Sequence, residues 1–158
     1  MSPLIIGIDP GKSGGIAYTD PESGKAIAVS MPDSPSDIVV FLKACVKEGA
    51  TTIFIEQLPR FVAGAGGKGP PGSRVAVLFE NFGIILGAAM AFGLSVVRVD
   101  PKRWQLEHGL GTANSCASKT IWKNKLKARA QELFPDLKVT LKTADALLIW
   151  EYGRRLGV

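Results

Sequence analysis

Two short apolar segments, "IIGID" and "TIFIE", each end on a carboxylate, and they constrain the fold of this chain more than any other feature. They place Asp9 and Glu56 at the ends of two buried strands. Either acid alone would be an ordinary polar residue leaving a strand. Adjacent strands, however, bring such ends side by side, and two carboxylates inside a protein repel each other unless a cation holds them. The sequence therefore predicts a sheet with a cation site at one edge.

The turn after Asp9 also has the Gly-Lys-Ser ending of a phosphate-binding loop. In such a loop the first glycine stands five residues before the second. Here Ile6 occupies that position and Gly7 comes one residue late, so the loop would be a residue short. We therefore interpret "IIGIDPGKSGGIA" as two strands joined by a turn that carries Asp9.

The order of apolar segments and turn residues predicts an alternation of strands and helices. The expected strands cover residues 4–8, 15–19, 26–30, 51–56 and 94–99. The expected helices cover residues 35–48, 73–91, 114–134 (or from 115) and 141–155, with caps at Ser34 and Ser73. Three antiparallel strands followed by two parallel ones make a mixed five-stranded sheet with helices on both faces. This is the element order of the ribonuclease H fold.

Composition adds limits on size, compartment and partners. With 158 residues and 46% hydrophobic content, residues 1–158 are expected to form one domain. The net charge is +5, and residues 98–129 alone carry eight Lys/Arg against two acids. This surplus permits an anionic partner. The two cysteines form no disulfide or zinc pattern, and we noted no signal segment or apolar run near transmembrane length. We therefore expect a cytoplasmic protein with no membrane partner.

A third acid, Asp145, stands in "ADALLIWEYGRR" near the start of the last expected helix. The helix dipole favours negative charge there. Its neighbours are alanines and leucines, which predicts a face packed on the sheet, and an acid on such a face needs a partner. Mg²⁺ coordinated by Asp9, Glu56 and Asp145 would supply that partner, because this ion prefers oxygen ligands and keeps room for a phosphate.

Several basic residues are candidates for binding a nucleic-acid backbone. Lys119 and Lys123 are four residues apart on the basic helix, so they share a face that would neutralise phosphates. A solvated helix face is the alternative. Lys102 and Arg103 follow the last strand and are expected near the same rim.

Two further features predict contacts with DNA and with a second copy of the chain. Arg60 and Phe61 open a glycine-rich loop just after Glu56, where the aromatic ring would either stack on an unpaired base or anchor the loop. On the helix over residues 73–91, small residues recur at four-residue spacing beside Phe79. Gly83 and Gly87 would let another helix approach closely, which predicts a homodimer.

The motifs "GIDPGKSGGIA", "IFIEQ", "LSVVRVDPKRW", "ARAQELFP" and "ADALLIWEYGRR" together resemble the RuvC-type Holliday junction resolvases, closest to the compact chloroplast, phage and bacterial branch. The resemblance covers nearly the whole chain. It implies a ribonuclease H-like fold, a homodimer, and two metal ions that promote water attack on DNA to make paired symmetric nicks in four-way junctions. Asp9, Glu56 and Asp145 match the family's acidic positions, with Mg²⁺ as cofactor and Mn²⁺ expected to substitute. A bacterial or phage-infected cytoplasm, or an organelle for a mature form, would follow.

One position departs from that family's pattern. A fourth ligand, Asp or His, usually precedes the last acid by about three to five residues, and Lys142 stands in that window. A protonated lysine cannot bind a metal. Lys142 would therefore replace one ion electrostatically as a catalytic residue, orient water, or mark a weakened site. If the site is weakened, the alternative function is a junction-binding protein of the same fold that is catalytically weakened or inactive. An actin-like ATPase would need about twice this length, and the basic helix argues against a general ribonuclease H.

Overall fold

The computed structural model describes residues 3–59 and 72–157, and its strands form one mixed sheet. The strands are β1 (Ile5–Asp9), β2 (Gly15–Thr19), β3 (Ala26–Ser30), β4 (Thr52–Glu56) and β5 (Ser95–Val99), in the spatial order β3-β2-β1-β4-β5. β1, β2 and β3 form an antiparallel meander, while β4 pairs in parallel with both β1 and β5. The predicted five-stranded sheet is confirmed, with strand bounds within one residue of those expected.

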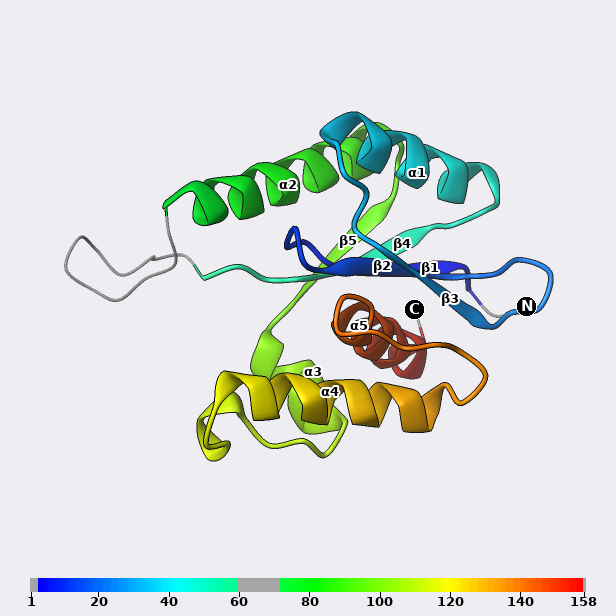
Figure 1. Ribbon diagram of the computed structural model, residues 1–158. Helices are drawn as coiled ribbons and strands as arrows, with labels where there is room; N and C mark the ends of the chain where they lie inside the picture. The colour runs from blue at the N-terminus through cyan, green and yellow to red at the C-terminus, as the bar shows by residue number, and fades with distance from the viewer. Residues whose placement is uncertain (1–2, 60–71, 158) are drawn as a thin grey trace.

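Helices cover both faces of this sheet (Figure 1). They are α1 (Pro35–Lys47), α2 (Gly72–Ala91), α3 (Pro101–Glu107), α4 (Lys119–Leu133) and α5 (Ala144–Leu156), with a short 3₁₀ turn, η1 (Ala113–Ser115), before α4. α1 and α2 lie on one face. α5 lies directly against the other face, and α3 and α4 lie outside it. The fold class that the sequence predicts is therefore confirmed.

α5 is the central helix of its layer and sits very close to β1. Every residue from Ala144 to Gly153 is buried, which accounts for the long apolar run in the sequence. Gly7 of β1 permits the approach, because a Cβ there would lie 2.7 Å from the carbonyl oxygen of Ala146. This close packing fixes the first turn of α5 against the sheet and so positions Asp145.

The structure differs from the sequence expectations in one additional helix and in three helix starts. The last helix begins at Ala144, not at residue 141. α3 was not expected, although Asp100 caps it by accepting a hydrogen bond from the Lys102 amide at 2.8 Å. The basic helix begins at Lys119, not at residue 114 or 115, because Ser118 provides the cap by accepting from the Ile121 amide. α2 begins at Gly72, one residue before the position expected of a cap at Ser73.

From the sequence, no apolar run near transmembrane length was expected, but α2 contains one. The window Arg74–Ala91 has a mean hydropathy of 1.5 and is long and apolar enough to cross a membrane by length and composition alone. The core helix of a globular protein meets the same criterion. One side of α2 packs on the sheet, where Phe82, Ile85 and Ala89 are buried.

Candidate active site at the edge of the sheet

Parallel pairing of β1 and β4 brings the first two acids together. Ile8 is in register with Ile55, so the next residue of each strand, Asp9 and Glu56, lies at the same edge of the sheet. Asp145 reaches this edge from the first turn of α5 and is only 5% exposed. The structure thus gathers the three acids that the sequence singled out.

The three carboxylates perturb one another. Burial, followed by repulsion from Asp145, raises the pKa of Asp9 to about 6, although Lys123 and the Gly11 amide oppose the rise. Burial, followed by repulsion from Asp9 and Asp145, raises the pKa of Glu56 to about 8. Carboxyls whose pKa is raised by burial and mutual repulsion form a cluster in which a bound cation would stabilise the ionised groups.

The turn after β1 holds Asp9 in place. The Gly11 amide donates to Asp9 Oδ1 at 3.3 Å, and the Gly14 amide donates to the Gly11 carbonyl at 2.8 Å. A Cβ on Gly14 would lie 2.7 Å from Asp9 Cγ, so only glycine leaves room for the carboxylate. The "PGKSG" turn therefore packs around the Asp9 carboxylate, which agrees with the interpretation of this segment as two strands joined by a turn.

Glu56 has a hydrogen-bond donor that the sequence analysis did not identify. Trp104 on α3 is fully buried, and its Nε1 donates to Glu56 Oε2 at 3.0 Å. This bond lowers the pKa of Glu56 and so opposes the effect of burial. The available signal was the "DPKRW" segment, in which a capping Asp followed by Pro predicts the start of a short helix but not the direction of Trp104.

A lysine from α4 enters the acid cluster. Lys123 Nζ lies 2.7 Å from Asp145 Oδ2, with the lysine side chain 37% exposed and the aspartate side chain 8% exposed. Burial alone would lower the pKa of Lys123. Asp145, with smaller contributions from Asp9 and Glu56, outweighs burial and raises that pKa, so the ammonium stays charged. Lys123 is therefore a member of the cluster as well as a residue of the basic face.

A cleft of about 640 Å³ opens over these residues. Its lining residues are Asp9, Gly11, Ser13, Gly14, Glu56, Leu58, Leu78, Lys119, Lys123, Leu141 and Lys142. The cleft therefore has acids at its base and lysines on its walls, which suits a ligand that carries negative charge beside a cation.

The chemistry of these acids fits a divalent cation, although the ligand set is not assembled. Asp145 Oδ1 is buried and accepts no hydrogen bond from the described residues, so it has an unused position for a cation. Hard carboxylate oxygens suit Mg²⁺. Over residues 3–59 and 72–157, however, no three Asp, Glu, His or Cys side chains stand close enough to hold one ion. Lys123 occupies one face of Asp145 instead.

The other basic candidates that the structure describes are exposed, and two of them line the cleft. Lys119 and Lys142 are exposed and line the cleft, and neither forms an ion pair within the described ranges. Lys102 and Arg103 are exposed on α3, which follows β5 at the edge where β4 also ends. Arg60 and Phe61 fall outside the described residues.

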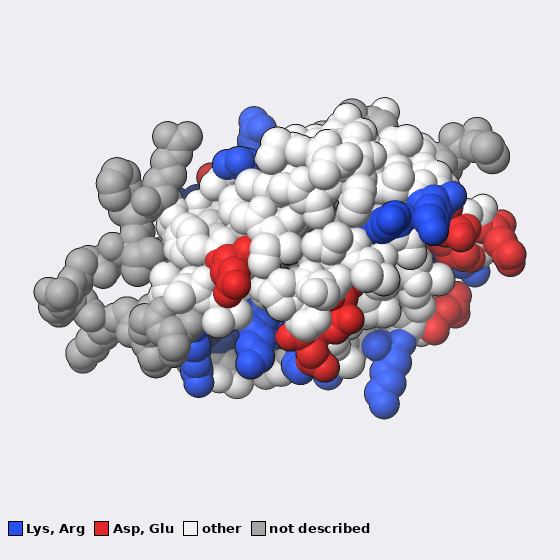
Figure 2. All heavy atoms as spheres, turned by 90° about the horizontal axis from the view of Figure 1, so that it is seen from above, with Lys and Arg blue, Asp and Glu red and all other residues white. Residues whose placement is uncertain are grey.

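The residues expected at a dimer interface are on the outer side of α2. Phe79 is 40% exposed, and the space where a Cβ of Gly83 or Gly87 would project is open. Figure 2 looks down on the face formed by α1 and α2 and shows a broad area without charged side chains, with Lys, Arg, Asp and Glu mainly around it. The outer side of α2 is therefore open to packing against an apolar surface of a second chain.

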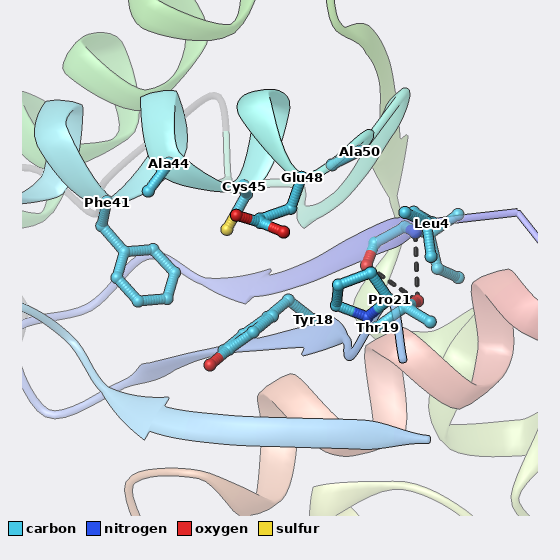
Figure 3. Close-up of a pocket in the computed structure, with 10 residues that line it drawn as sticks. Leu4, Tyr18, Thr19, Pro21, Phe41, Ala44, Cys45, Glu48 and Ala50 are labelled. Carbon is cyan, nitrogen blue, oxygen red and sulfur yellow. Dashed lines mark hydrogen bonds between the residues drawn. The ribbon is translucent and has the colours of Figure 1, made fainter. Parts of the chain in front are cut away.

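A second, apolar cavity of about 170 Å³ lies between α1 and the start of β1, far from the acid edge of the sheet (Figure 3). The rings of Tyr18 and Phe41 meet edge to face at 5.4 Å on its wall. Burial raises the pKa of Cys45 there to about 11, so its sulfur stays a thiol at neutral pH. Cys45 is thus the buried core residue that the helix periodicity predicted.

His108 differs from the sequence interpretation, which treated it as a loop residue without a partner. It caps the end of α3, is only 3% exposed, and its Nε2 lies 2.7 Å from the carbonyl oxygen of Leu148 on α5. Burial lowers the pKa of His108, which favours the neutral ring. The contact joins α3 to α5 and has a structural role.

The sheet order β3-β2-β1-β4-β5, with helices on both faces, is that of the ribonuclease H-like fold, and in this chain acids stand at the ends of β1 and β4 and at the start of α5. No protein-family model and no curated protein sequence matches the chain.

Solved structures of RuvC from Thermus thermophilus share the fold over nearly the whole length. One, in complex with a Holliday junction substrate, matches with a TM-score of 0.59 at 15% identity, covering 98% of this chain and 96% of that chain. Another RuvC structure matches with a TM-score of 0.52 at 18% identity, covering 98% and 97%. The chain therefore has the RuvC-type fold.

Proposed function

We propose that this protein is an endonuclease that resolves four-way DNA junctions by metal-dependent phosphodiester hydrolysis. The observation that carries the proposal is a cleft in a RuvC-type fold that is lined by Asp9, Glu56 and lysines, with Asp145 joined to it through Lys123. The solved relative with that fold contains a Holliday junction substrate. A cytoplasmic location in a bacterial or phage-infected cell is part of the proposal.

Asp9, Glu56 and Asp145 would hold Mg²⁺, for which Mn²⁺ would substitute. The bound metal would polarise a phosphate oxygen and lower the pKa of water. The protein's own contribution is to fix the acids. The turn at Gly11 and Gly14 orients Asp9, Trp104 orients Glu56, and burial of α5 orients Asp145. Placing these acids on strands and a buried helix favours precise geometry.

DNA phosphates would bind along the cleft walls and the neighbouring rim. Lys119 and Lys142 present exposed ammonium groups beside the acids, and Lys102 and Arg103 extend the positive surface at the same sheet edge. Such contacts supply affinity for the backbone without reading the sequence. A homodimer formed through the outer side of α2 would match the two-fold symmetry of a junction.

A junction-binding protein of the same fold with weak or no activity is a second candidate, and a specific observation favours it. Lys123 already neutralises Asp145, and no three acids are arranged as a ligand set among the described residues. Such a protein would retain the basic cleft walls. It would bind junctions equally well with and without a divalent metal, and would leave both strands intact.

The deciding experiment is a cleavage assay on a synthetic four-way junction with Mg²⁺, Mn²⁺ or EDTA, read for paired symmetric nicks. We expect cutting with either metal and none with EDTA.

Asp9→Asn is expected to abolish cleavage, since it removes a metal ligand, and to leave junction binding equal or tighter, since it removes a charge that repels phosphate. Cutting by Asp9→Asn at the wild-type rate would disprove the metal site. Binding without cutting by the wild-type protein would favour the second candidate.

A further inference from the structure

Lys123 has two features that a lysine on a solvated helix face lacks. Its ammonium contacts a nearly buried carboxylate at 2.7 Å, and its side chain nevertheless remains 37% exposed. It also lines the cleft beside Lys119. Its ammonium therefore contacts the acid cluster, while its partly exposed side chain lines the cleft where a charged ligand would arrive.

The ion pair occupies a carboxylate that the proposed function assigns to the metal. An ammonium held against Asp145 Oδ2 would repel a divalent ion placed on the same carboxylate, because like charges at such separations cost free energy even when partly screened. The lysine has four flexible methylene groups and can withdraw without moving α4. The acid cannot, because Asp145 is on a helix packed tightly against β1.

We propose that Lys123 is an internal counter-ion that holds Asp145 in the metal-free protein and leaves it when a divalent ion binds, so that its ammonium becomes available to a DNA phosphate in the cleft. This inference rests on the proposed function, because it takes the acids as the metal site. It separates Lys123 from Lys119, which lines the same cleft without an ion pair in the described parts of the chain.

Two consequences follow. The ion pair prevents Asp145 from remaining an unpaired buried charge, which would otherwise destabilise the empty site. It also couples the two ligands: metal binding frees a phosphate contact, and a phosphate that captures Lys123 vacates the carboxylate. Metal and DNA would thus each strengthen the binding of the other by the same factor, as linkage requires.

The test compares Mn²⁺ binding by Lys123→Met and Lys119→Met with that of the wild-type protein, without DNA, by isothermal titration calorimetry. Methionine retains most of the length and removes the charge. We expect Lys123→Met to bind Mn²⁺ about tenfold more tightly, corresponding to about 1.4 kcal/mol, and Lys119→Met to change affinity by less than about threefold, since its charge is screened by solvent. Equal or weaker binding by Lys123→Met, or equal gains in both variants, would overturn the inference.

A second measurement follows the wild-type protein itself and uses the variants only to assign one signal. The side-chain ammonium signal of Lys123 in ¹⁵N NMR, assigned by its loss in Lys123→Met or Lys123→Gln, is expected to be protected by the ion pair in EDTA and to lose that protection with saturating Mg²⁺. A signal that Mg²⁺ leaves unchanged would overturn the inference, as would absence of metal binding in every variant. Junction cutting is measured separately. If metal displaces Lys123 but the junction stays uncut, only the proposed function is refuted. If the junction is cut while the Lys123 signal is unchanged by metal, only this inference is refuted.

Discussion

Asp9 depends on a tight turn, and the two glycines of that turn differ in how much space surrounds them. A Cβ on Gly14 would lie 2.7 Å from Asp9 Cγ, whereas a Cβ on Gly11 would have its nearest neighbour at 3.7 Å. We predict that Gly14→Ala displaces the carboxylate, destabilises the protein by roughly 2 kcal/mol and removes most metal affinity. Thermal unfolding and Mn²⁺ titration measure both effects.

Gly11→Ala is the matched control in the same turn. It retains the amide that donates to Asp9 and meets only ordinary contacts, so stability and metal affinity are expected to stay close to wild type. Equal losses in the two variants would show that the turn needs glycine for its backbone and not for space around Asp9.

The raised pKa of Glu56 predicts a pH dependence of stability in the metal-free protein. A carboxyl with a folded pKa of about 8 against an ordinary value of 4.5 is more readily protonated in the folded state. The contribution of Glu56 to the free energy of unfolding is therefore fully favourable below about pH 4.5 and is lost as pH rises through 8. We therefore expect Glu56→Gln to gain stability relative to wild type between pH 5 and pH 9 in EDTA, on the order of a few kcal/mol.

Urea unfolding at several pH values measures this difference, with Glu107→Gln, a change of an exposed glutamate on α3, as the control. The control is expected to parallel wild type across the range. A Glu56→Gln curve that also runs parallel to wild type would show that Glu56 is not desolvated by its surroundings.

The acids of the site could be predicted from the sequence, and their partners could not. Asp9 and Glu56 end apolar segments, and Asp145 lies among apolar neighbours, so strand pairing and helix burial were enough to bring them together. The donors Trp104 and Lys123 come from elements 48 and 22 residues away in sequence from the acids they contact. Where a long side chain ends depends on the packing of α3 and α4, which no local pattern specifies.

Among the elements, strands and long helices were predicted well because hydrophobic periodicity decides them. α3 was missed since it has seven residues and buries only Trp104, too short a stripe to show a period. The start of α4 was placed four or five residues early because "ANSCAS" holds several possible caps. Residues 113–115 form η1, and Ser118 provides the cap of α4.

The position of Lys119 on α4 predicts how this helix contributes to DNA binding. Lys119 is exposed at its first turn on the cleft wall, whereas Lys43 is exposed on α1, which covers the opposite sheet face (Figure 1). We expect Lys119→Ala to weaken binding to all duplex DNAs and to reduce the slope of log K against log salt by about 0.9. Lys43→Ala should leave the slope unchanged. Fluorescence anisotropy at several salt concentrations measures it, and equal slopes for all three proteins would assign Lys119 to a solvated helix face.

For the whole molecule, α2 links the site to the proposed assembly. One side of α2 packs on the sheet through Phe82, Ile85 and Ala89, while Phe79 and Met90 remain exposed on its surface at 40% and 69%. A monomer would leave this apolar side in water, and exposed apolar patches of this kind mark interaction sites. A second copy of the chain is the occupant that would also place two acid clusters around one two-fold junction.

Gly87→Glu tests that assembly, because the open space at Gly87 accepts a side chain within the folded monomer, while a carboxylate there would be buried against a partner helix. We predict that wild type sediments as a dimer of 16.8 kDa chains and that the variant sediments as a folded monomer, whose Tm is lowered only by loss of the dimer contacts. On a cruciform plasmid, wild type should make paired nicks and hence linear product, and the variant single nicks and hence open circles.

Leu106→Glu, at a 59% exposed residue of α3, adds the same charge elsewhere and should remain dimeric and cut in pairs. A dimeric Gly87→Glu variant, or a monomeric wild type that still linearises the plasmid, would place the pairing of cuts outside α2.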